Sequence, residues 1–473
     1  MLSDHIEKSI LQKIGKVPTN GQKQLIKQFA SFILTGADDE IFLITGYAGT
    51  GKTTAIAAII NALTELKIKT QLMAPTGRAA KILSIFSGKP AQTIHKSIYK
   101  QKSSNDGFGK FVLGKNLTVD TFYIVDEASM IGNQSFDASI FGSGNLLEDL
   151  ISYVYGGKRC KLVLIGDSAQ LPPVNSSESP ALNATNLKSL GFSVEAVCLT
   201  DVVRQTQESG ILSNATKVRN LISTNSIEIP NFITSKFSDI IKLSGADLIS
   251  ELDNCYGKFG EEQTMVVTRS NKRANLFNSG IRKTILYREE QISASDYLMV
   301  VKNNYFWLAS DEELNFIANG DIVQVVKLSK FEERYGFHFV NAKIRLNDLD
   351  DRELDVKIIL ETLDIEGASL TADDNKKLFY AVFEDYKHLK PKKAIYDAIK
   401  NDAYFNALQV KFAYAITCHK AQGGQWKAVF VDQGFFVKDM LNIEYLRWMY
   451  TAITRASERL YLVNFNKDFV EPD

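Results

Sequence analysis

The sequence has few cysteines and few prolines, and it lacks a long apolar run. Its four cysteines, Cys160, Cys198, Cys255 and Cys418, lie far apart and form no CxxC pair, which argues against a disulfide framework or a structural zinc site. No stretch reaches the roughly 18 uncharged apolar residues that a membrane-spanning helix needs. The N-terminus also lacks the apolar core of a secretory signal. We therefore expect a cytosolic (cytoplasmic) protein with no membrane partner and with bystander thiols.

The chain also lacks an excess of either charge, since Lys+Arg and Asp+Glu are both 55. This balance argues against a passive electrostatic nucleic-acid binder, but a local basic channel remains compatible with it. The 45% hydrophobic and 23% charged content is typical of a globular protein. At roughly 150 residues per domain, 473 residues suggest about three domains.

Apolar strands alternate with amphipathic helices in two series. Residues 40–46, 69–75, 121–129 and 161–168 have the pattern of buried strands, and 53–67 has apolar residues at helical spacing. A second series of strands occupies 263–270, 427–434 and 459–465. Such alternation predicts α/β cores with parallel sheets, whose ligands bind at the carboxyl ends of the strands.

The pattern changes between the two parts of the second series. Residues 337–348 and 354–363 alternate as half-buried strands do, and 371–408 is helical, charged and aromatic. We predict a first core over 1–195, a second core over 196–325 and 406–473, and an inserted domain over 326–405.

A glycine-rich segment, residues 46–53, matches G-x-x-x-x-G-K-[ST] between a strand and a helix. Its backbone N–H groups and the helix N-terminus would face phosphates, Lys52 would contact the outer phosphates, and Thr53 would hold Mg²⁺. A turn that binds nothing is the alternative. The predicted ATP-binding residues here are Gly46, Ala48, Gly49, Thr50, Gly51, Lys52, Thr53 and Thr54.

Two adjacent carboxylates end the strand at 121–125. Asp126 suits the Mg²⁺ shell, and Glu127 suits the base that activates a water molecule. Alone, this pair could be a solvated strand end. With the phosphate loop it favours a hydrolase over a small-molecule kinase.

Two arginines could complete the site. A guanidinium inserted beside the transferred phosphoryl group is worth about 10³-fold or more. Arg204 lies in LTDVVRQ and Arg455 in YTAITRA. Taken alone, each would more often form a surface ion pair.

The order of these motifs resembles that of superfamily 1 helicases, in particular the RecD-like and phage Dda-like branch. The resemblance covers about residues 18 to 463, apart from the insert, and it implies two RecA-like P-loop NTPase cores with ATP between them. By resemblance, Gln22 binds adenine, Gln170 senses the γ-phosphate, Arg204 and Arg455 are catalytic, and Gly423 belongs to a motif that touches nucleotide and DNA. The segments that carry the resemblance are 18–22, 74–80, 93–95, 166–173, 203–205, 417–423 and 450–456.

The sequence departs from the family pattern at two places. Gly424-Gln425 stand where Ser-Glu is common, which leaves a ribose contact open. Val203 stands where a tyrosine often stacks on adenine, so base recognition rests more on Gln22, and the use of other NTPs stays open.

The resemblance also places residues on a single-stranded DNA track. Neutral donors suit a motor that releases and rebinds the strand, although Ser and Thr side chains also cap helices. The predicted DNA-binding residues are Pro75, Thr76, Arg78, Thr93, His95, Thr417, His419 and Lys420.

Residues of about 98–118 predict a β-hairpin, with turn residues at 105–107 and at Gly109. The family carries a pin that splits the duplex at this place, and Phe108 and Phe111 could stack on the terminal base pair of an ss/ds DNA junction. A surface hairpin with one packed Phe is an equal alternative. The insert could form a small β-barrel with a helical tower, and residues 303–305 and 319–321 resemble segments that flank this barrel.

Four functions remain open from the sequence. The first is an ATP-dependent DNA helicase, which the resemblance implies moves 5′→3′. A translocase with little unwinding, an RNA helicase and a nucleotide switch are the others, and the set Glu127, Gln170, Arg204 and Arg455 argues against the switch. The plan needs only a monomer. Protein partners and the pathway stay open, with DNA repair, replication restart, conjugation and phage biology all compatible.

Overall fold

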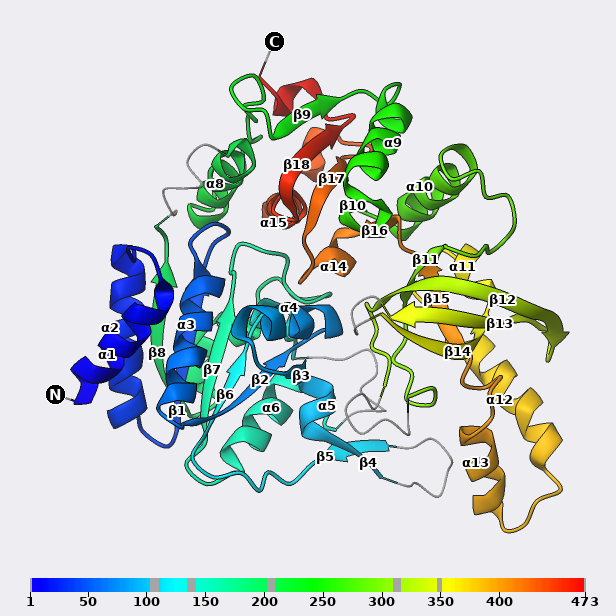
Figure 1. Cartoon of the computed structure of the whole chain (residues 1–473), viewed down its shortest axis with the longest axis horizontal. Helices are drawn as coiled ribbons and strands as arrows, with labels where there is room; N and C mark the ends of the chain where they lie inside the picture. Colours follow the sequence, from blue (N-terminus) through cyan, green and yellow to red (C-terminus); the bar gives the residue numbers. More distant parts are fainter. Residues whose placement is uncertain are drawn as a thin grey trace.

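The computed structural model describes residues 2–102, 110–133, 142–201, 209–308, 316–346 and 351–471. Two α/β lobes and a β-barrel make up this part of the chain (Figure 1). The first lobe carries the blue and cyan segments, the second runs from green to red, and the yellow barrel stands beside both. No helix among the described residues is long and apolar enough to cross a lipid bilayer.

The first lobe is built on a six-stranded parallel sheet with the order β3-β2-β6-β7-β1-β8. The strands predicted at 40–46, 69–75, 121–129 and 161–168 are confirmed as β1, β2, β6 and β7. The strands are β1 Glu40–Gly46, β2 Lys69–Ala74, β3 Ala91–Thr93, β6 Thr121–Val125, β7 Lys161–Gly166 and β8 Ser193–Leu199. The helices are α1 Leu2–Ile14, α2 Asn20–Thr35, α3 Lys52–Glu65, α4 Gly77–Ser87, α5 Ile94–Ile98, α6 Leu146–Tyr155 and α7 Ala184–Ser189.

The centre of this sheet is apolar because helices cover both of its faces. Every residue of β6 is buried, as expected for a parallel strand with a helix layer on each side. Helices α1, α2 and α3 pack on one face, and α5 and α6 pack on the other. Polar groups that could bind a ligand therefore lie at the ends of the strands.

The second lobe repeats this plan with a five-stranded parallel sheet of order β16-β10-β17-β18-β9. The predicted strands at 263–270, 427–434 and 459–465 are confirmed as β10, β17 and β18. The strands are β9 Ile240–Leu243, β10 Thr264–Thr268, β16 Ala415–Thr417, β17 Trp426–Asp432 and β18 Ala456–Val463. The helices are α8 Gly210–Ser223, α9 Leu248–Phe259, α10 Asn271–Thr284, α14 Cys418–Ala421 and α15 Ile443–Ile453.

A closed five-stranded barrel interrupts the second lobe. Its strands are β11 Tyr297–Val300, β12 Ile322–Arg334, β13 Phe337–Leu346, β14 Arg352–Ile359 and β15 Leu408–Phe412. Between β14 and β15 the chain forms the helices α11 Glu361–Asp364, α12 Ala372–Tyr386 and α13 Lys392–Lys400. The two parallel sheets and the closed barrel confirm the predicted fold class, two parallel RecA-like cores with an inserted barrel.

The barrel differs from the predicted limits of the insert, 326–405. Closure requires β11 and β15, which pair through Leu298 and Phe412, and both strands lie outside those limits. The first sheet likewise continues through β8 to Leu199, past the predicted boundary at 195. In sequence, these short apolar runs look like ordinary core strands, so strand pairing alone reveals which sheet they join.

The predicted hairpin is present as two antiparallel strands. β4, Tyr99–Lys102, pairs with β5, Lys110–Leu113. The segment between them, with Phe108, lies outside the described residues.

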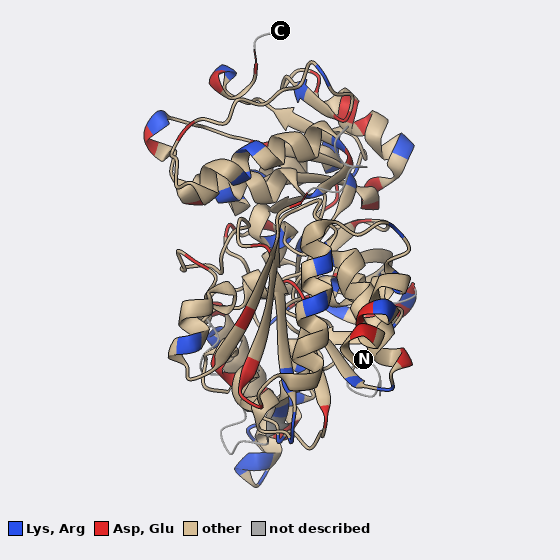
Figure 2. Ribbon diagram, turned by 90° about the vertical axis from the view of Figure 1, so that its left-hand side faces the viewer, with Lys and Arg blue, Asp and Glu red and all other residues tan. Residues whose placement is uncertain are grey.

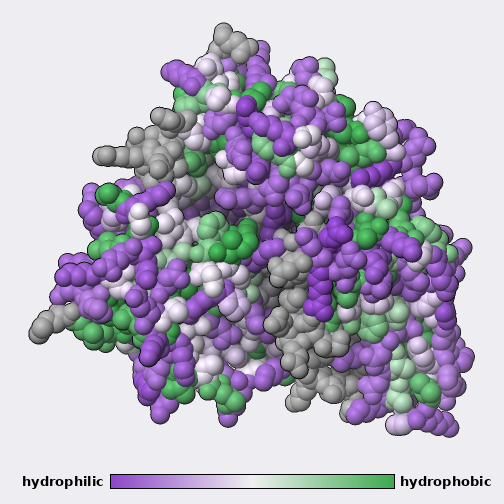
Figure 3. Space-filling model, in the orientation of Figure 1, coloured by the Kyte–Doolittle hydropathy of each residue, from purple (hydrophilic) through white to green (hydrophobic). Residues whose placement is uncertain are grey.

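Charges of both signs are mixed over the two lobes (Figure 2), in keeping with the zero net charge. The face seen in Figure 3 is largely hydrophilic and carries small, separate hydrophobic patches. Neither view provides a broad basic face, so binding of a polyanion would depend on a local channel.

Candidate active site and nucleic-acid interface

The glycine-rich loop between β1 and α3 leaves the first turn of α3 open to an anion. Gly51, the N-cap of α3, has φ +74° and provides no side-chain cap. Helix N-terminal N–H groups without a cap attract phosphates. Lys52 Nζ donates to the carbonyl oxygens of Gly46, at 2.6 Å, and Tyr47, at 2.9 Å. Its ammonium group is thus held at the loop mouth.

The other predicted members of the loop surround this opening. Thr50 is buried, and its hydroxyl donates to the carbonyl oxygen of Tyr47. Thr53 and Thr54 are exposed at the start of α3. Thr53 is therefore accessible to a metal ion, and its role at Mg²⁺ stays a prediction.

The carboxylates after β6 lie in a strongly perturbed environment. Asp126 accepts the backbone N–H of Glu127 at 2.8 Å, and burial raises the pKa of Asp126. Burial, together with the negative charge of Asp126, raises the pKa of Glu127 to about 7, while the charges of Arg455 and Lys52 oppose the shift. A carboxyl group with such a pKa is suited to taking a proton near neutral pH.

Two polar atoms in the cleft have no hydrogen-bond partner among the described residues. They are Glu127 Oε2 and Gln170 Oε1, and both are buried. An unpaired buried acceptor costs about 1–3 kcal/mol, so such atoms are rare unless a ligand or water completes them. The predicted roles of these residues, on the attacking water and on the γ-phosphate, fit this environment.

The second core reaches the phosphate loop through helix α15. The hydroxyl of Tyr450 accepts the N–H of Ala48 at 2.8 Å and donates to Asp167 Oδ2 at 2.7 Å. Next to it, Thr451 Oγ1 accepts the N–H of Leu171 at 2.8 Å. The Leu171 carbonyl oxygen accepts Gln422 Nε2 at 2.7 Å. The motifs at 46–53 and 166–173 are thus bonded directly to the opposite core.

Arg455 follows α15 and is 5% exposed. Its guanidinium donates to the carbonyl oxygens of Thr451 and Gly424, both in its own core. Because its charge lowers the pKa of Glu127, Arg455 acts on the cleft from the second core. The sequence left open that Arg455 forms a surface ion pair. In the structure, Arg455 is buried and bonds to backbone carbonyl oxygens instead. Arg204 lies outside the described residues.

Gln22, expected to bind adenine, is buried and bonded to the protein at both ends of its amide. Its Nε2 donates to the carbonyl oxygens of Thr50, at 3.3 Å, and Gly51, at 3.4 Å. Its Oε1 accepts the N–H of Thr19, completing a capping box at the start of α2. An adenine contact would have to replace some of these bonds.

The residues predicted for the DNA track gather at the opposite side of the cleft. Thr76 caps α4 by accepting the N–H of Ala79, and Thr93 caps α5 by accepting the N–H of Lys96, each at 3.2 Å. Each hydroxyl can still donate its own hydrogen. Pro75, just before Thr76, is half-buried. Capping and strand contact are therefore compatible for these threonines.

The two cores approach each other along this track. The guanidinium of Arg78 stacks on Trp426 of the second core, 4.1 Å from the ring centroid. Gly423 packs against α4, where a Cβ would come 3.1 Å from the Cβ of Ala79. Gly423 thus lies between the cores beside Thr76, at the DNA-side motif of the first core.

The barrel also contributes to this region. Lys420 Nζ donates to Asn319 Oδ1 at 2.6 Å. Gly77, at the start of α4, lies so close to Asp321 that a Cβ there would meet Asp321 Oδ1 at 2.4 Å. Glycine at 77 therefore permits the close approach of the barrel loop. Burial and the charge of Lys411 lower the pKa of Lys420 to about 8.

Burial disfavours the charged form of both histidines of the track. Burial lowers the pKa of His95 to about 4, and burial also lowers that of His419. Thr417, before His419, is the N-cap of α14 and makes no side-chain cap bond. Lowered histidine pKa values are compatible with the neutral donors expected for most of the track, whose role in DNA binding stays a prediction.

Comparison with known proteins assigns both lobes. The family model of an AAA domain matches residues 18–225, and that of a UvrD-like helicase C-terminal domain matches 412–463. The ATP-dependent DNA helicase dda of Enterobacteria phage T4 is 27% identical over 457 residues, covering 89% of this chain and 91% of that relative. Over most of its length, the chain is similar to helicases of the RecD-like and Dda-like type.

Two further relatives and one solved structure align with most of this chain. The RecBCD enzyme subunit RecD of Buchnera aphidicola is 26% identical, covering 94% of this chain and 73% of the relative. The ATP-dependent RecD2 DNA helicase of Deinococcus radiodurans is 24% identical, covering 94% of this chain and 50% of the relative. A crystal structure of Pif1 helicase from Bacteroides with ADP-AlF3 and ssDNA aligns over 97% of this chain, at TM-score 0.49 and 15% identity.

The hairpin of this helicase contacts the segment that flanks the barrel. Phe111 packs on Tyr305, with ring centroids 4.7 Å apart, and Tyr305 packs on Phe316 at 4.9 Å. Phe111, one of the two aromatics expected to stack on DNA, therefore has a protein partner. The other, Phe108, lies outside the described residues.

Several residues of the helicase site were not predicted from sequence. Tyr450, Asp167 and Thr451 stand within recognised motifs, but nothing local shows that they bond across the cleft. Tyr47 stacks under Arg219 of α8, at 4.4 Å from the ring centroid. The sequence marks these residues only as members of a motif. It does not show their contacts, because the residue that each one contacts lies in the other core.

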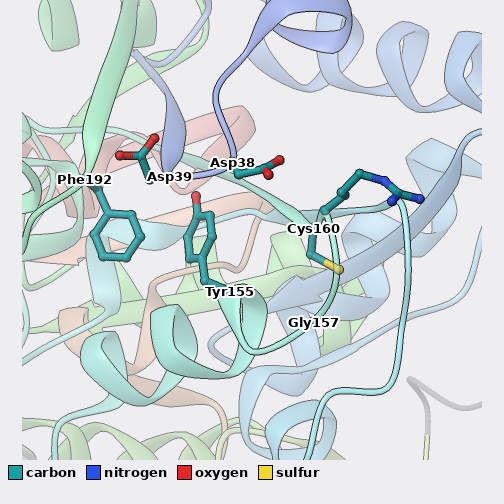
Figure 4. A pocket seen from close by; sticks show the side chains of 7 residues that line it. Asp38, Asp39, Tyr155, Gly157, Cys160 and Phe192 are labelled. Carbon is teal, nitrogen blue, oxygen red and sulfur yellow. The ribbon is translucent and has the colours of Figure 1, made fainter.

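One cavity lies away from this cleft. It measures ≈ 370 Å³ and is lined by Asp38, Asp39, Tyr155, Gly157, Arg159, Cys160 and Phe192 (Figure 4). Asp39 precedes β1 and Cys160 precedes β7, so the cavity opens at the amino ends of these two strands, opposite the end of β1 that leads into the glycine-rich loop. The described residues contain no cluster of His, Cys, Asp or Glu that could by itself hold a metal ion.

Proposed function

We propose that this helicase is an ATP-driven motor that translocates 5′→3′ on single-stranded DNA and unwinds the duplex ahead. One observation carries the proposal: the phosphate loop of the first core is bonded across the cleft to α15, whose end lies two residues before Arg455. Nucleotide held there would contact both cores, and its hydrolysis would change their separation. The names of the RecD2 and Dda relatives support DNA as the substrate and ATP as the nucleotide that is hydrolysed.

The reaction needs a nucleotide, a metal ion and a water molecule. Lys52 and the open N-terminus of α3 would bind the phosphates. Thr53, which is exposed, and Asp126 would hold Mg²⁺, whose role is to neutralise charge on the phosphates. Glu127 would take the proton of the attacking water, and Arg455 would stabilise the charge of the transferred phosphoryl group.

The contacts between segments also support a proposed division of the described chain. The first core would run from residue 2 to 199 and the second over 209–296 and 413–471, with the barrel domain over 297–412. The strand would run along the Thr76, Thr93, Thr417 and His419 side, where both cores and the barrel loop meet.

A forked-DNA series tests this function. Duplexes with a 5′ tail only, a 3′ tail only and no tail are unwound with ATP and Mg²⁺, and Lys52→Ala serves as the control. Unwinding of the 5′-tailed substrate alone is expected. Preference for the 3′ tail would contradict the direction, and equal unwinding of RNA would contradict the choice of DNA.

A translocase with little unwinding is the second candidate. The packing of Phe111 on Tyr305 favours it, because this aromatic of the hairpin is engaged within the protein. ATP hydrolysis stimulated by single strands, without strand separation on any fork, would decide for the translocase.

A further inference from the structure

The guanidinium of Arg78 lies over the ring of Trp426 and joins the two cores. Arg78 belongs to α4 of the first core, and its Cζ is 4.1 Å from the ring centroid of Trp426 in the second core. Its Nη2 also donates to the carbonyl oxygen of Gln425 at 3.4 Å. Trp426 is 1% exposed, and a cation is attracted more strongly to an indole ring when water is excluded. Arg78 is therefore held by a specific contact with the second core.

Gly424 allows the arginine to reach this ring. A Cβ at residue 424 would come 2.6 Å from Cη2 of Trp426 and 3.1 Å from Nε of Arg78. The first distance is too short for a real contact, and a buried indole ring cannot yield as a flexible side chain can. Glycine at 424 is therefore needed for the packing of Arg78 on Trp426.

The segment formed by residues 424–426 also holds Arg455. Nη1 of Arg455 donates to the carbonyl oxygen of Gly424 at 3.2 Å, and the carbonyl oxygen of Arg455 accepts the N–H of Trp426 at 3.0 Å. Arg455 is thus bonded to this segment through both its side chain and its main chain. Because Arg78 packs on the same segment, a first-core residue supports the residues that support Arg455.

We propose that Arg78 is a positioning residue that sets the place of Arg455 through the segment 424–426. The inference rests on the proposed function, in which Arg455 stabilises the transferred phosphoryl group. Since Arg78 and Trp426 belong to different cores, closure of the cleft would complete this support. Arg78 also lies two residues after Thr76, so the contact would link the DNA side of the cleft to ATP hydrolysis. A guanidinium has five N–H donors, so packing on the ring is compatible with a DNA contact.

Arg78→Lys separates positioning from a contact with DNA. Lysine keeps the positive charge that attracts a phosphate but lacks the planar group that packs on the ring. Phosphate release at saturating single-stranded DNA is expected to fall about 10-fold, because a small displacement of a catalytic group is costly. The DNA concentration for half-maximal stimulation should change by less than about 2-fold. Arg334→Lys is the matched control, because its guanidinium packs on Tyr404 within the barrel domain, and it should stay near wild type.

A double-mutant cycle with Gly424→Ala tests the path through the segment. Gly424→Ala should lower the maximal turnover by a similar factor, because its Cβ displaces the contact between Arg78 and Trp426. In that variant, Arg78→Lys should cost less than about 2-fold more, since the two changes remove one interaction. Gly257→Ala, whose Cβ would meet no described atom within 4 Å, is the control for the glycine change.

Turnover is counted per folded molecule, with thermal unfolding as the check, so that a merely structural loss does not lower it. Unchanged maximal turnover of Arg78→Lys, with or without a higher half-maximal DNA concentration, would overturn the proposal. Independent losses that multiply in the cycle would overturn the path through the segment 424–426. If Gly424→Ala does not fold, Arg78→Lys and Arg78→Ala decide, and both should lower maximal turnover. Absence of DNA-stimulated hydrolysis in the wild type would instead contradict the proposed function.

Discussion

Each core has a β–loop–α unit, and the two units differ in how the N-terminus of the helix is capped. In the first core, β1 leads through the glycine-rich loop into α3, whose N-cap Gly51 leaves the helix N-terminus open. In the second core, β10 leads into α10, whose N-cap Ser270 accepts the N–H of Arg273 through its hydroxyl. One helix terminus is free to bind an anion, and the other is already satisfied by the chain.

This difference explains why the second core contributes side chains instead of a second phosphate loop. Its contacts at the cleft come from Tyr450 and Thr451 of α15 and from Arg455, two residues after the end of this helix. A single nucleotide would be bound by the first core and contacted by side chains of the second core. The second set of contacts would therefore depend on whether the cleft is closed.

On the opposite side of the cleft, the cores are alike. Thr93-Ile94-His95 follows β3, and Thr417-Cys418-His419 follows β16, each at the edge strand of its sheet. Each Thr starts a short helix, and burial lowers the pKa of each His. The cores would therefore hold DNA by similar means while using nucleotide asymmetrically.

The largest effect that tests this asymmetry is expected for Arg455→Ala. Loss of the second core's guanidinium should lower DNA-stimulated ATP hydrolysis by about 10³-fold or more, measured as steady-state phosphate release. Arg459→Ala, an exposed arginine that bonds to the Ser238 carbonyl oxygen, is the control and should remain near wild type. Wild-type turnover by Arg455→Ala would show that the first core hydrolyses ATP without the second.

A slightly smaller loss is expected for the base. Glu127→Gln should reduce turnover by about 10²- to 10⁴-fold while ATP still binds, because the amide cannot take a proton. Lys52→Ala should abolish turnover together with much of the binding. Calorimetry and phosphate release separate the two. Retention of DNA-stimulated hydrolysis by Glu127→Gln would make the assignment of the base wrong.

The likeness of the DNA sides is tested by removing one track contact from each core. Thr76→Ala with His419→Ala should raise the single-strand concentration for half-maximal stimulation by roughly 10-fold, as two neutral hydrogen bonds would. Hydrolysis without DNA should change little. An unchanged stimulation curve would remove both residues from the track.

The smallest effect concerns stability. Because the folded pKa of His95 is about 4 and the unfolded value about 6.5, the unfolded chain binds more protons between these values, and stability falls as pH falls through that window. From pH 7 to pH 5, this group should remove about 2 kcal/mol. Thermal unfolding of His95→Gln should show a correspondingly weaker loss over the same range. Equal pH dependence would mean that His95 is not held neutral by burial.

Residues that act with their sequence neighbours could be predicted from the sequence. The phosphate loop, Asp126 and Glu127 each follow an apolar strand, and the carboxyl ends of parallel strands meet at one edge of a sheet. The alternation of strands and helices likewise predicted the two parallel sheets, and the change of pattern after them predicted an insert, whereas its barrel was implied by the family resemblance.

Tertiary structure decided which distant groups meet. The sequence provided no reason to pair Tyr450 with Ala48, Phe111 with Tyr305, or β11 with β15, because each pair joins segments whose separation in the chain carries no periodic signal. The sequence therefore determined where phosphate chemistry can occur, since a glycine loop and a helix terminus form locally. Only the folded chain determined how the second core senses that chemistry, since its contacts exist only when the two cores face each other.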